Sequence, residues 1–188
     1  RHTSLRCQTR MAPASTRSRF SSSDSMQQYG PGNALRVLHC IPHLSSGGAD
    51  RVAATLVRYL QRDPSLRVGL CVFNSGQVMP DRLHGISEVM TLDFDGSHKH
   101  PRELWRFVRS FRRIVQRWKP HVMHAHLWPA CRFASTATGG FPVRHIWHAH
   151  DLRAWLGSDD PASRLFRAWT RCLVRQREPQ VIAVSQAV

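Results

Sequence analysis

Residues 35–60 read LRVLHCIPHLSSGGADRVAATLVRYL, and this stretch predicts a strand, a glycine-containing loop and a helix. The apolar run Leu35–Ile41 ends at Pro42, which is typical of a short buried strand. Apolar residues then recur at helical spacing over 52–60. A strand followed closely by a helix is the repeating unit of α/β proteins, so this stretch sets the expected fold class.

The same alternation continues along the chain. Further strands are expected at 67–73, 88–92, 121–126, 144–150 and 181–184, and further helices at 101–118, 129–138 and about 161–175. Six strands that alternate with helices predict an α/β fold, with a parallel sheet covered by helices on both faces. Such sheets bind ligands at the carboxyl ends of the strands, near the switch in strand order. Residues that directly follow a strand are therefore the first candidates for a site.

Composition bounds the class of protein. The chain has 188 residues, of which 41% are hydrophobic and 21% charged, which excludes wholesale disorder. Residues 1–34 are rich in Arg and Ser, and we expect a disordered or spurious tail there, with Met11 and Met26 as alternative starts. The rest is the size of one domain. The longest unbroken apolar stretch, 68–73, is far shorter than the ~20 residues of a membrane span.

The chain is strongly basic, with 27 Lys and Arg against 12 Asp and Glu, a net charge of +15. Such a surface favours nucleic acid, anionic lipid or phosphorylated ligands. Almost all of these cations are Arg, a skew that genome composition also produces. No recognised nucleic-acid motif is present, so we expect no specific nucleic-acid partner. The Arg102–Lys119 helix is a candidate for contact with an anionic membrane; the alternative is an ordinary solvated outer face.

The five cysteines are scattered and form no C-x-x-C pair, so neither a disulfide framework nor a zinc knuckle is indicated. This usage fits a reducing cytosol. We therefore expect a cytoplasmic protein, and one at the inner face of the membrane if the Arg102–Lys119 helix binds lipid.

The loop after the first expected strand contains paired glycines, Gly47 and Gly48, followed by Asp50 at the start of a helix. Paired glycines let backbone N–H groups approach a ligand closely, and the positive end of a helix favours an anion. The loop matches neither the Walker pattern nor the spaced-glycine dinucleotide pattern. A tight turn, with Asp50 offsetting the helix dipole, is an equally good interpretation.

Two pairs of alternate histidines follow later strands: His124 with His126, and His148 with His150. Residues two apart in a strand share a face, so each pair points one way. One hypothesis is a cleft for an anion or a sugar, and a rival is a metal-dependent hydrolase. The binuclear pattern H-x-H-x-D-H is not met, because Asp151 follows His150 directly. We expect no bound metal there; solvated or core histidines are the third possibility.

These segments together resemble the N-terminal domain of a GT-B glycosyltransferase of the large retaining family 4, over about residues 35–188. The resemblance rests on Arg36-Val37-Leu38-His39 leading to Gly47-Gly48-Ala49-Asp50-Arg51-Val52, on Val122-Met123-His124-Ala125-His126, on His148-Ala149-His150-Asp151-Leu152 and on Val181-Ile182-Ala183-Val184-Ser185. The family commonly has Gly-Gly-Ala-Glu where this chain has Asp50, a mild departure.

The resemblance implies one Rossmann-like half of a GT-B fold that transfers a sugar, with retention, from a nucleotide-sugar donor to a saccharide or lipid-linked acceptor. It implies that Gly47 and Gly48 bind a donor or acceptor phosphate, and that His150 is catalytic through contact with the donor. His126, Asp151 and Ser185 would line the cleft. Neither a metal nor another cofactor is implied.

The chain stops at Val188, around the point where the family crosses into its second domain. That C-terminal donor-binding domain normally carries most nucleotide contacts and the paired glutamates. We expect it to be absent here, and this polypeptide alone to be catalytically inactive. The remaining alternative is a non-catalytic module that binds anions or lipid through its Arg-rich surface.

Overall fold

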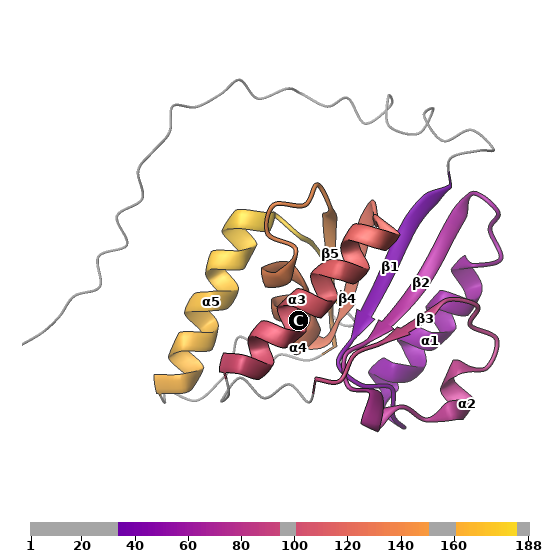
Figure 1. Ribbon diagram of the computed structural model, residues 1–188, viewed down its shortest axis with the longest axis horizontal. Coiled ribbons are helices and arrows are strands. Elements are labelled where there is room, and N and C mark those ends of the chain that lie inside the picture. The colour runs from indigo at the N-terminus through magenta and orange to yellow at the C-terminus, as the bar shows by residue number, and fades with distance from the viewer. Residues whose placement is uncertain (1–33, 95–100, 151–160, 184–188) are drawn as a thin grey trace, which may run out of the picture.

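The computed structural model describes residues 34–94, 101–150 and 161–183 (Figure 1). Six strands form one sheet in the order β3-β2-β1-β4-β5-β6, and every neighbouring pair is parallel. The strands are β1 (Leu35–Ile41), β2 (Leu66–Val72), β3 (Val89–Thr91), β4 (Val122–His126), β5 (Arg144–Ala149) and β6 (Gln180–Ala183). This is the doubly wound order of a Rossmann-like sheet, which confirms the predicted fold class.

Helices connect the strands on both faces of the sheet. They are α1 (Gly48–Leu60), α2 (Pro80–Leu83), α3 (Pro101–Trp118), α4 (Leu127–Ala137) and α5 (Pro161–Arg177), together with a 3₁₀ turn, η1 (Ser75–Gln77). In Figure 1, α5 lies on one side of the molecule and α1 and α2 on the other. No helix in the described ranges is both long and apolar enough to cross a bilayer.

Most predicted bounds agree with the structure to within two residues, but two helix starts differ. Helix α1 begins at Gly48 rather than near Val52, because its first turn carries no large apolar side chain to show the period. Helix α4 begins at Leu127 rather than Pro129. Leu127 makes a sharp bend with a positive φ of 67°. Pro129 then occupies the first turn, where the missing N–H breaks no helical hydrogen bond.

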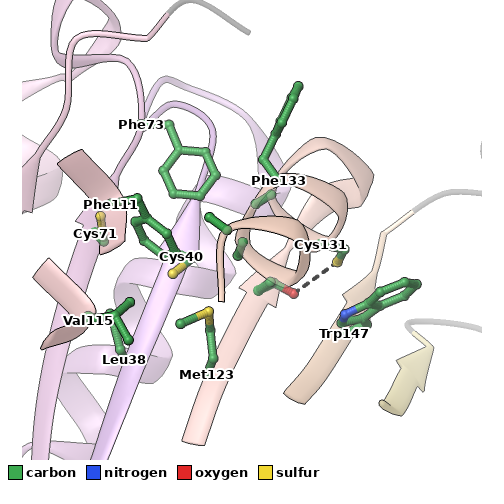
Figure 2. Close-up of a cluster of buried hydrophobic side chains, with 14 of the residues drawn as sticks. Leu38, Cys40, Cys71, Phe73, Phe111, Val115, Met123, Cys131, Phe133 and Trp147 are labelled. Carbon is green, nitrogen blue, oxygen red and sulfur yellow. Dashed lines mark hydrogen bonds between the residues drawn. The ribbon is translucent and has the colours of Figure 1, made fainter. Parts of the chain in front are cut away.

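The larger core lies between the sheet and helices α3, α4 and α5. Figure 2 shows Phe111 and Val115 of α3 in this core, with Leu38 of β1 and Met123 of β4. All four side chains are almost completely buried. The Cys131 thiol donates to the carbonyl oxygen of Ala125 at 3.4 Å, which ties α4 to β4 (Figure 2).

The smaller core lies on the opposite face, under α1. Ala53, Ala54 and Val57 of this helix pack against Val68, Leu70 and Val72 of β2 and Ile41 of β1. Because side chains alternate along a strand, this face also carries His39, between Leu38 and Cys40 of the other core. The same alternation places His124 and His126 of β4 and His148 of β5 on the α1 face, whereas His145 of β5 lies on the other face and contacts Ser135 of α4.

Helix α3 has the bounds and the two faces that the sequence predicts. Phe107, Phe111, Val115 and Trp118 are buried. The arginines expected on the outer side are exposed: Arg102, Arg106, Arg109, Arg113 and Arg117. A further arginine, Arg112, donates to the carbonyl oxygens of Ala137 and Gly139 at 2.9 and 2.8 Å, so it joins α3 to the end of α4.

Four cysteines lie in the described part of the chain, and all are free thiols: Cys40, Cys71, Cys131 and Cys172. The first three are buried, and burial raises the pKa of the Cys40 and Cys131 thiols well above the usual value. Such thiols act as small core side chains and are poor nucleophiles.

Candidate functional site

The switch in strand order lies between β1 and β4, which are neighbours in the sheet although far apart in sequence. Successive connections leave β1 toward β2 on one side and β4 toward β5 on the other, so their carboxyl ends open a crevice. The loop that contains Gly47 and Gly48 follows β1, and His126 is the last residue of β4. Both sequence-predicted features therefore flank this crevice.

The glycine loop leads directly into α1, with Gly47 as the N-cap and no side chain capping the helix. Neither Gly47 nor Gly48 has a positive φ; in the described ranges the glycines with positive φ are Gly85 and Gly140. A β-carbon added at Gly48 would meet no heavy atom within 4 Å. The backbone conformation therefore does not require glycine at either position, and the missing side chains leave the first N–H groups of α1 accessible.

The Asp50 side chain stabilises this loop by hydrogen bonds. Its side chain is completely buried, and one carboxylate oxygen accepts from both the backbone N–H and the hydroxyl of Ser45, each at 2.7 Å. His43 Nδ1 lies 3.4 Å from the same oxygen. The carboxylate is thus directed at the residues before the helix, and it fixes the path of the chain from β1 to α1.

Five histidine rings form one continuous array on the α1 face of the sheet. They come from β1 (His39), from β4 (His124 and His126), from β5 (His148) and from the residue after β5 (His150). The neighbouring ring centroids are 4.3–5.7 Å apart. Strand register explains the array, since His39 lies opposite His124 and His126 lies opposite His148.

His126 is at the centre of this array. Its Nε2 is 3.1 Å from Nδ1 of His39, and its Nδ1 is 3.4 Å from Nε2 of His150. A neutral imidazole has one donor and one acceptor, so the two contacts must run in the same direction along the three rings. The series leads from the buried centre of the sheet to His150, which is half-buried.

Burial keeps four of these imidazoles uncharged. It lowers the pKa of His124 and of His148 to about 4, with a further contribution from neighbouring histidines. The pKa values of His39 and His126 lie well below the ordinary value for the same two reasons. At neutral pH these four rings therefore present lone pairs and N–H groups without a positive charge.

The sequence-predicted residues are thus placed as follows. Gly47 and Gly48 lie at the start of α1 beside the crevice, and His126 and His150 contact each other. Asp151 and Ser185 lie outside the described residues, and their predicted place on the cleft wall stays a prediction. The histidine pairs indeed share a face, as the strand period requires.

Sequence reasoning missed one residue of this region and the contacts of another. His39 joins the array from β1, but a single histidine inside an apolar strand gives no sign of a site. Asp50 lies in the first turn of α1, as the sequence predicts, but its hydrogen bonds with Ser45 were not expected. The pattern of a buried acid five residues after a serine is too common to reveal this contact.

A cavity of about 460 Å³ opens at the carboxyl end of β3, beside the first turns of α3. Its polar lining consists of Asp93, Glu103, Arg106 and Ser110, and Phe94 and Phe107 form its apolar wall. Groups of both charges beside aromatic rings suit a ligand rich in hydroxyl groups.

The rival metal-dependent hydrolase needs metal ligands and a group that activates water. The structure does bring the four predicted histidines together, along with His39. However, the two groups of described residues whose ligand atoms converge contain histidine alone, with no carboxylate. The described residues of the array thus offer ligands for a metal, without the carboxylate ligands that a binuclear hydrolase adds to its histidines.

The sequence of this chain matches the model of one protein family. A sequence model described as Glycosyltransferase Family 4 matches residues 46–188, which is most of the chain. No curated protein matches this chain by sequence.

Solved structures of similar fold include several enzymes that act on sugars. A glycosyltransferase from Rickettsia africae is 15% identical with a TM-score of 0.59, and the match covers 81% of this chain and 37% of that one. A proposed UDP-N-acetylglucosamine 2-epimerase from Listeria monocytogenes is 16% identical with a TM-score of 0.57, covering 74% and 37%. Sucrose-phosphate synthase from Thermosynechococcus elongatus is 12% identical with a TM-score of 0.51, covering 80% and 47%.

These likenesses establish the fold, which a transferase, a synthase and an epimerase share. The chain spans less than half the length of each of these three proteins.

Proposed function

Because this chain belongs to Glycosyltransferase Family 4, we propose that it forms the acceptor-side half of a GT-B glycosyltransferase. The reaction is transfer of a sugar from a nucleotide-sugar donor to a saccharide or lipid-linked acceptor, with retention of the anomeric configuration. The bond between the donor sugar and its phosphate breaks, and the nucleoside diphosphate leaves with the electron pair. The oxygen of an acceptor hydroxyl bonds to the sugar, and its proton passes to the leaving phosphate.

The geometry of the glycine loop carries this proposal. Gly48 has an ordinary backbone conformation and open space where a side chain would be. A turn type that needs a positive φ does not explain the two glycines, since neither Gly47 nor Gly48 has one. An accessible helix N-terminus at the switch in strand order is well suited to a donor phosphate.

In this proposal the chain's own N–H groups stabilise the phosphate as it leaves. The first turn of α1 supplies them at Gly48 and Ala49, because no side chain caps the helix. Preorganised donors of this kind stabilise developing negative charge without reorganisation, so the transfer needs no obligatory metal. One carboxylate oxygen of Asp50 accepts from the backbone N–H and the hydroxyl of Ser45, which offset part of its negative charge near the anion.

His150 is the proposed catalytic contact to the donor sugar, with His126 behind it on the cleft wall. Their 3.4 Å contact orients the His150 ring. Asp151 and Ser185 are proposed to complete the wall. The acceptor is assigned to the cavity beside β3, where Asp93, Glu103 and Arg106 are placed to bind its hydroxyl groups.

The exposed face of α3 supports a further part of the proposal, contact with an anionic membrane at the cytoplasmic side. Trp105 is 59% exposed on this helix, and the Arg109 guanidinium lies over its ring at 5.2 Å from the centroid. Exposed arginines beside an exposed tryptophan are the usual composition of a membrane-surface helix. A lipid-linked acceptor would then reach the adjacent cavity from the bilayer.

The substitution Gly48→Ala tests the phosphate site. Binding of UDP-glucose, GDP-mannose, ADP-glucose and inorganic pyrophosphate is measured by ligand-observed NMR. We expect at least one of them to bind the original chain, and Gly48→Ala to weaken that binding at least tenfold. Because alanine forms helix better than glycine, the same variant should be as stable as the original or more so.

Thr55→Ala, at an exposed position further along α1, is the matched control and should bind as the original does. Unchanged binding in Gly48→Ala, or binding of none of the four ligands, would contradict the phosphate site. Where transfer is detected, the anomeric coupling in the product reports retention or inversion.

A further inference from the structure

The histidine array contains two overlapping groups of converging ligand atoms. His39, His124 and His126 form one, and His126, His148 and His150 form the other; within each group the ligand nitrogens lie within 4.8 Å of one another. A core that needed only to be filled would hold apolar side chains at these positions. Strands β1, β4 and β5 instead bring imidazoles together at one spot, and three of the five rings have a nitrogen with no hydrogen-bond partner among the described residues.

Several of these nitrogens lack a partner. Nε2 of His39, Nε2 of His124 and Nδ1 of His148 are buried with no hydrogen-bond partner among the described residues. His148 is 8% exposed and His124 5%. Leaving a buried polar atom unpaired costs roughly 1–3 kcal/mol. Of these three atoms, Nδ1 of His148 belongs to the second group, and an ion bound through it would give it a partner.

We call His126, His148 and His150 the outer group, and their spacing suits a tetrahedral metal ion. Zn–N bonds of about 2.0–2.1 Å place two ligand nitrogens about 3.4 Å apart at the tetrahedral angle. Nδ1 of His126 and Nε2 of His150 are 3.4 Å apart, so an ion could replace their hydrogen bond with little movement of the rings. His148 stacks beside His150, with the ring centroids 4.3 Å apart, and offers the third nitrogen.

The chemistry of the donors selects the class of ion. Neutral imidazole is a good ligand for Zn²⁺ and its neighbours in the first transition series, whereas Mg²⁺ and Ca²⁺ take oxygen ligands. The group holds no carboxylate or thiolate. His150 is half-buried, so the outer group is reachable from the surface and leaves a fourth position for water.

We propose that His126, His148 and His150 bind one divalent transition-metal ion of the zinc class at the carboxyl edge of β4 and β5. Nδ1 of His39 contacts Nε2 of His126 at 3.1 Å, and the His124 ring stacks against the His126 ring, so both hold His126 in position. This departs from the expectation of no metal at these histidines, which rested on the sequence pattern and not on the arrangement of the rings. The site does not depend on the proposed function, and an ion on His150 would compete with a donor sugar there.

The test is a metal titration of the whole 188-residue chain, after chelator treatment and removal of the chelator. Zn²⁺ binding is measured in competition with a chromophoric chelator, and Co²⁺ is added separately because its visible spectrum reports tetrahedral nitrogen coordination. We expect one equivalent of either ion. His150→Gln should lower the affinity at least tenfold, and its half-buried position makes it the variant least harmful to folding. His148→Gln should act in the same direction.

Two controls separate this site from general chelation by histidine. His84→Gln removes an exposed imidazole outside the array. The double variant His98→Gln with His100→Gln removes another pair of alternate histidines in the sequence. Both should keep the original stoichiometry and affinity. Original affinity in His150→Gln, no Zn²⁺ binding by the original chain, or loss of binding in the His98 and His100 variant would overturn the proposal.

Discussion

Burial of His124 and His148 determines their protonation state in the histidine array. In a solvated loop each ring would be partly protonated near neutral pH. Between strands, beside other imidazoles, both stay neutral down to a pKa of about 4. The consequence is a group of lone pairs held together without mutual repulsion, which is the condition for binding either a polar ligand or a metal ion.

Protonation of this array should destabilise the chain in acid. The pKa of His124 is about 4 in the folded chain and about 6.5 when unfolded. Between these values the unfolded chain binds more protons, so the stability present above pH 6.5 is lost as the pH falls toward 4. We expect His124 to contribute a loss on the order of 2 kcal/mol between about pH 7.5 and pH 5. Urea denaturation at the two pH values measures it.

The double variant His124→Asn with His148→Asn should show a shallower pH dependence than the original chain, whatever its stability at neutral pH. His84→Asn, at an exposed position, should leave the dependence unchanged. An equally steep dependence in the double variant would mean that other groups control the acid transition.

At the level of elements, α3 illustrates how well amphipathic periodicity predicts a helix. Its apolar stripe and its arginine face lie where the sequence predicts them, and its bounds agree at both ends. Helix α4 shows the opposite case. It is buried on most sides, so its period is weak, and its start depends on the sharp bend at Leu127. A positive φ at a leucine is imposed by the neighbouring structure.

Removal of one aromatic ring from α3 should measure how much this helix stabilises the fold. Phe111 is completely buried against the sheet, so Phe111→Ala should lower the free energy of unfolding by about 3–5 kcal/mol. Tyr59 of α1 is 68% exposed, and Tyr59→Ala should change it by less than about 0.5 kcal/mol. Denaturant unfolding of both variants tests the difference, and similar losses would contradict the assigned core.

At the level of the whole molecule, the arginines behind the net charge of +15 have two kinds of surroundings. Some arginines are structural, such as Arg112 between α3 and α4 and Arg132, whose guanidinium lies over the Phe166 ring. The outer arginines of α3 are exposed along the length of this helix, as is Trp105, and Arg109 lies over the Trp105 ring. An interaction with a negative surface should therefore be concentrated on this helix.

Binding to anionic vesicles should consequently depend on α3. Replacing Arg109, Arg113 and Arg117 with Gln should weaken binding to phosphatidylserine-containing vesicles about a hundredfold at low salt, since each cation contributes about 1 kcal/mol. Replacing the exposed Arg62, Arg144 and Arg171 is the control of equal charge. Co-sedimentation measures both, and equal weakening by the two sets would show that only net charge matters.

Much of the candidate site could be predicted from the sequence, because its residues directly follow strands and the alternation of a strand is easily recognised. Gly47, Gly48, His126 and His150 were all located this way. The hydrogen bonds of Asp50 and the participation of His39 were not, because both depend on which strands become neighbours. Asp151 and Ser185 remain predictions.

The sequence by itself determined the class of fold, since hydrophobic periods are local and persist whatever the partner elements are. It also fixed which residues lie at the carboxyl ends of strands. Only the tertiary structure decided that β1 lies beside β4, and so brought His39 to His124 and His126 across a separation of more than 80 residues. The physical reason is that strand order and register are set by the packing of the whole sheet, whereas alternation within one strand is a property of that strand alone.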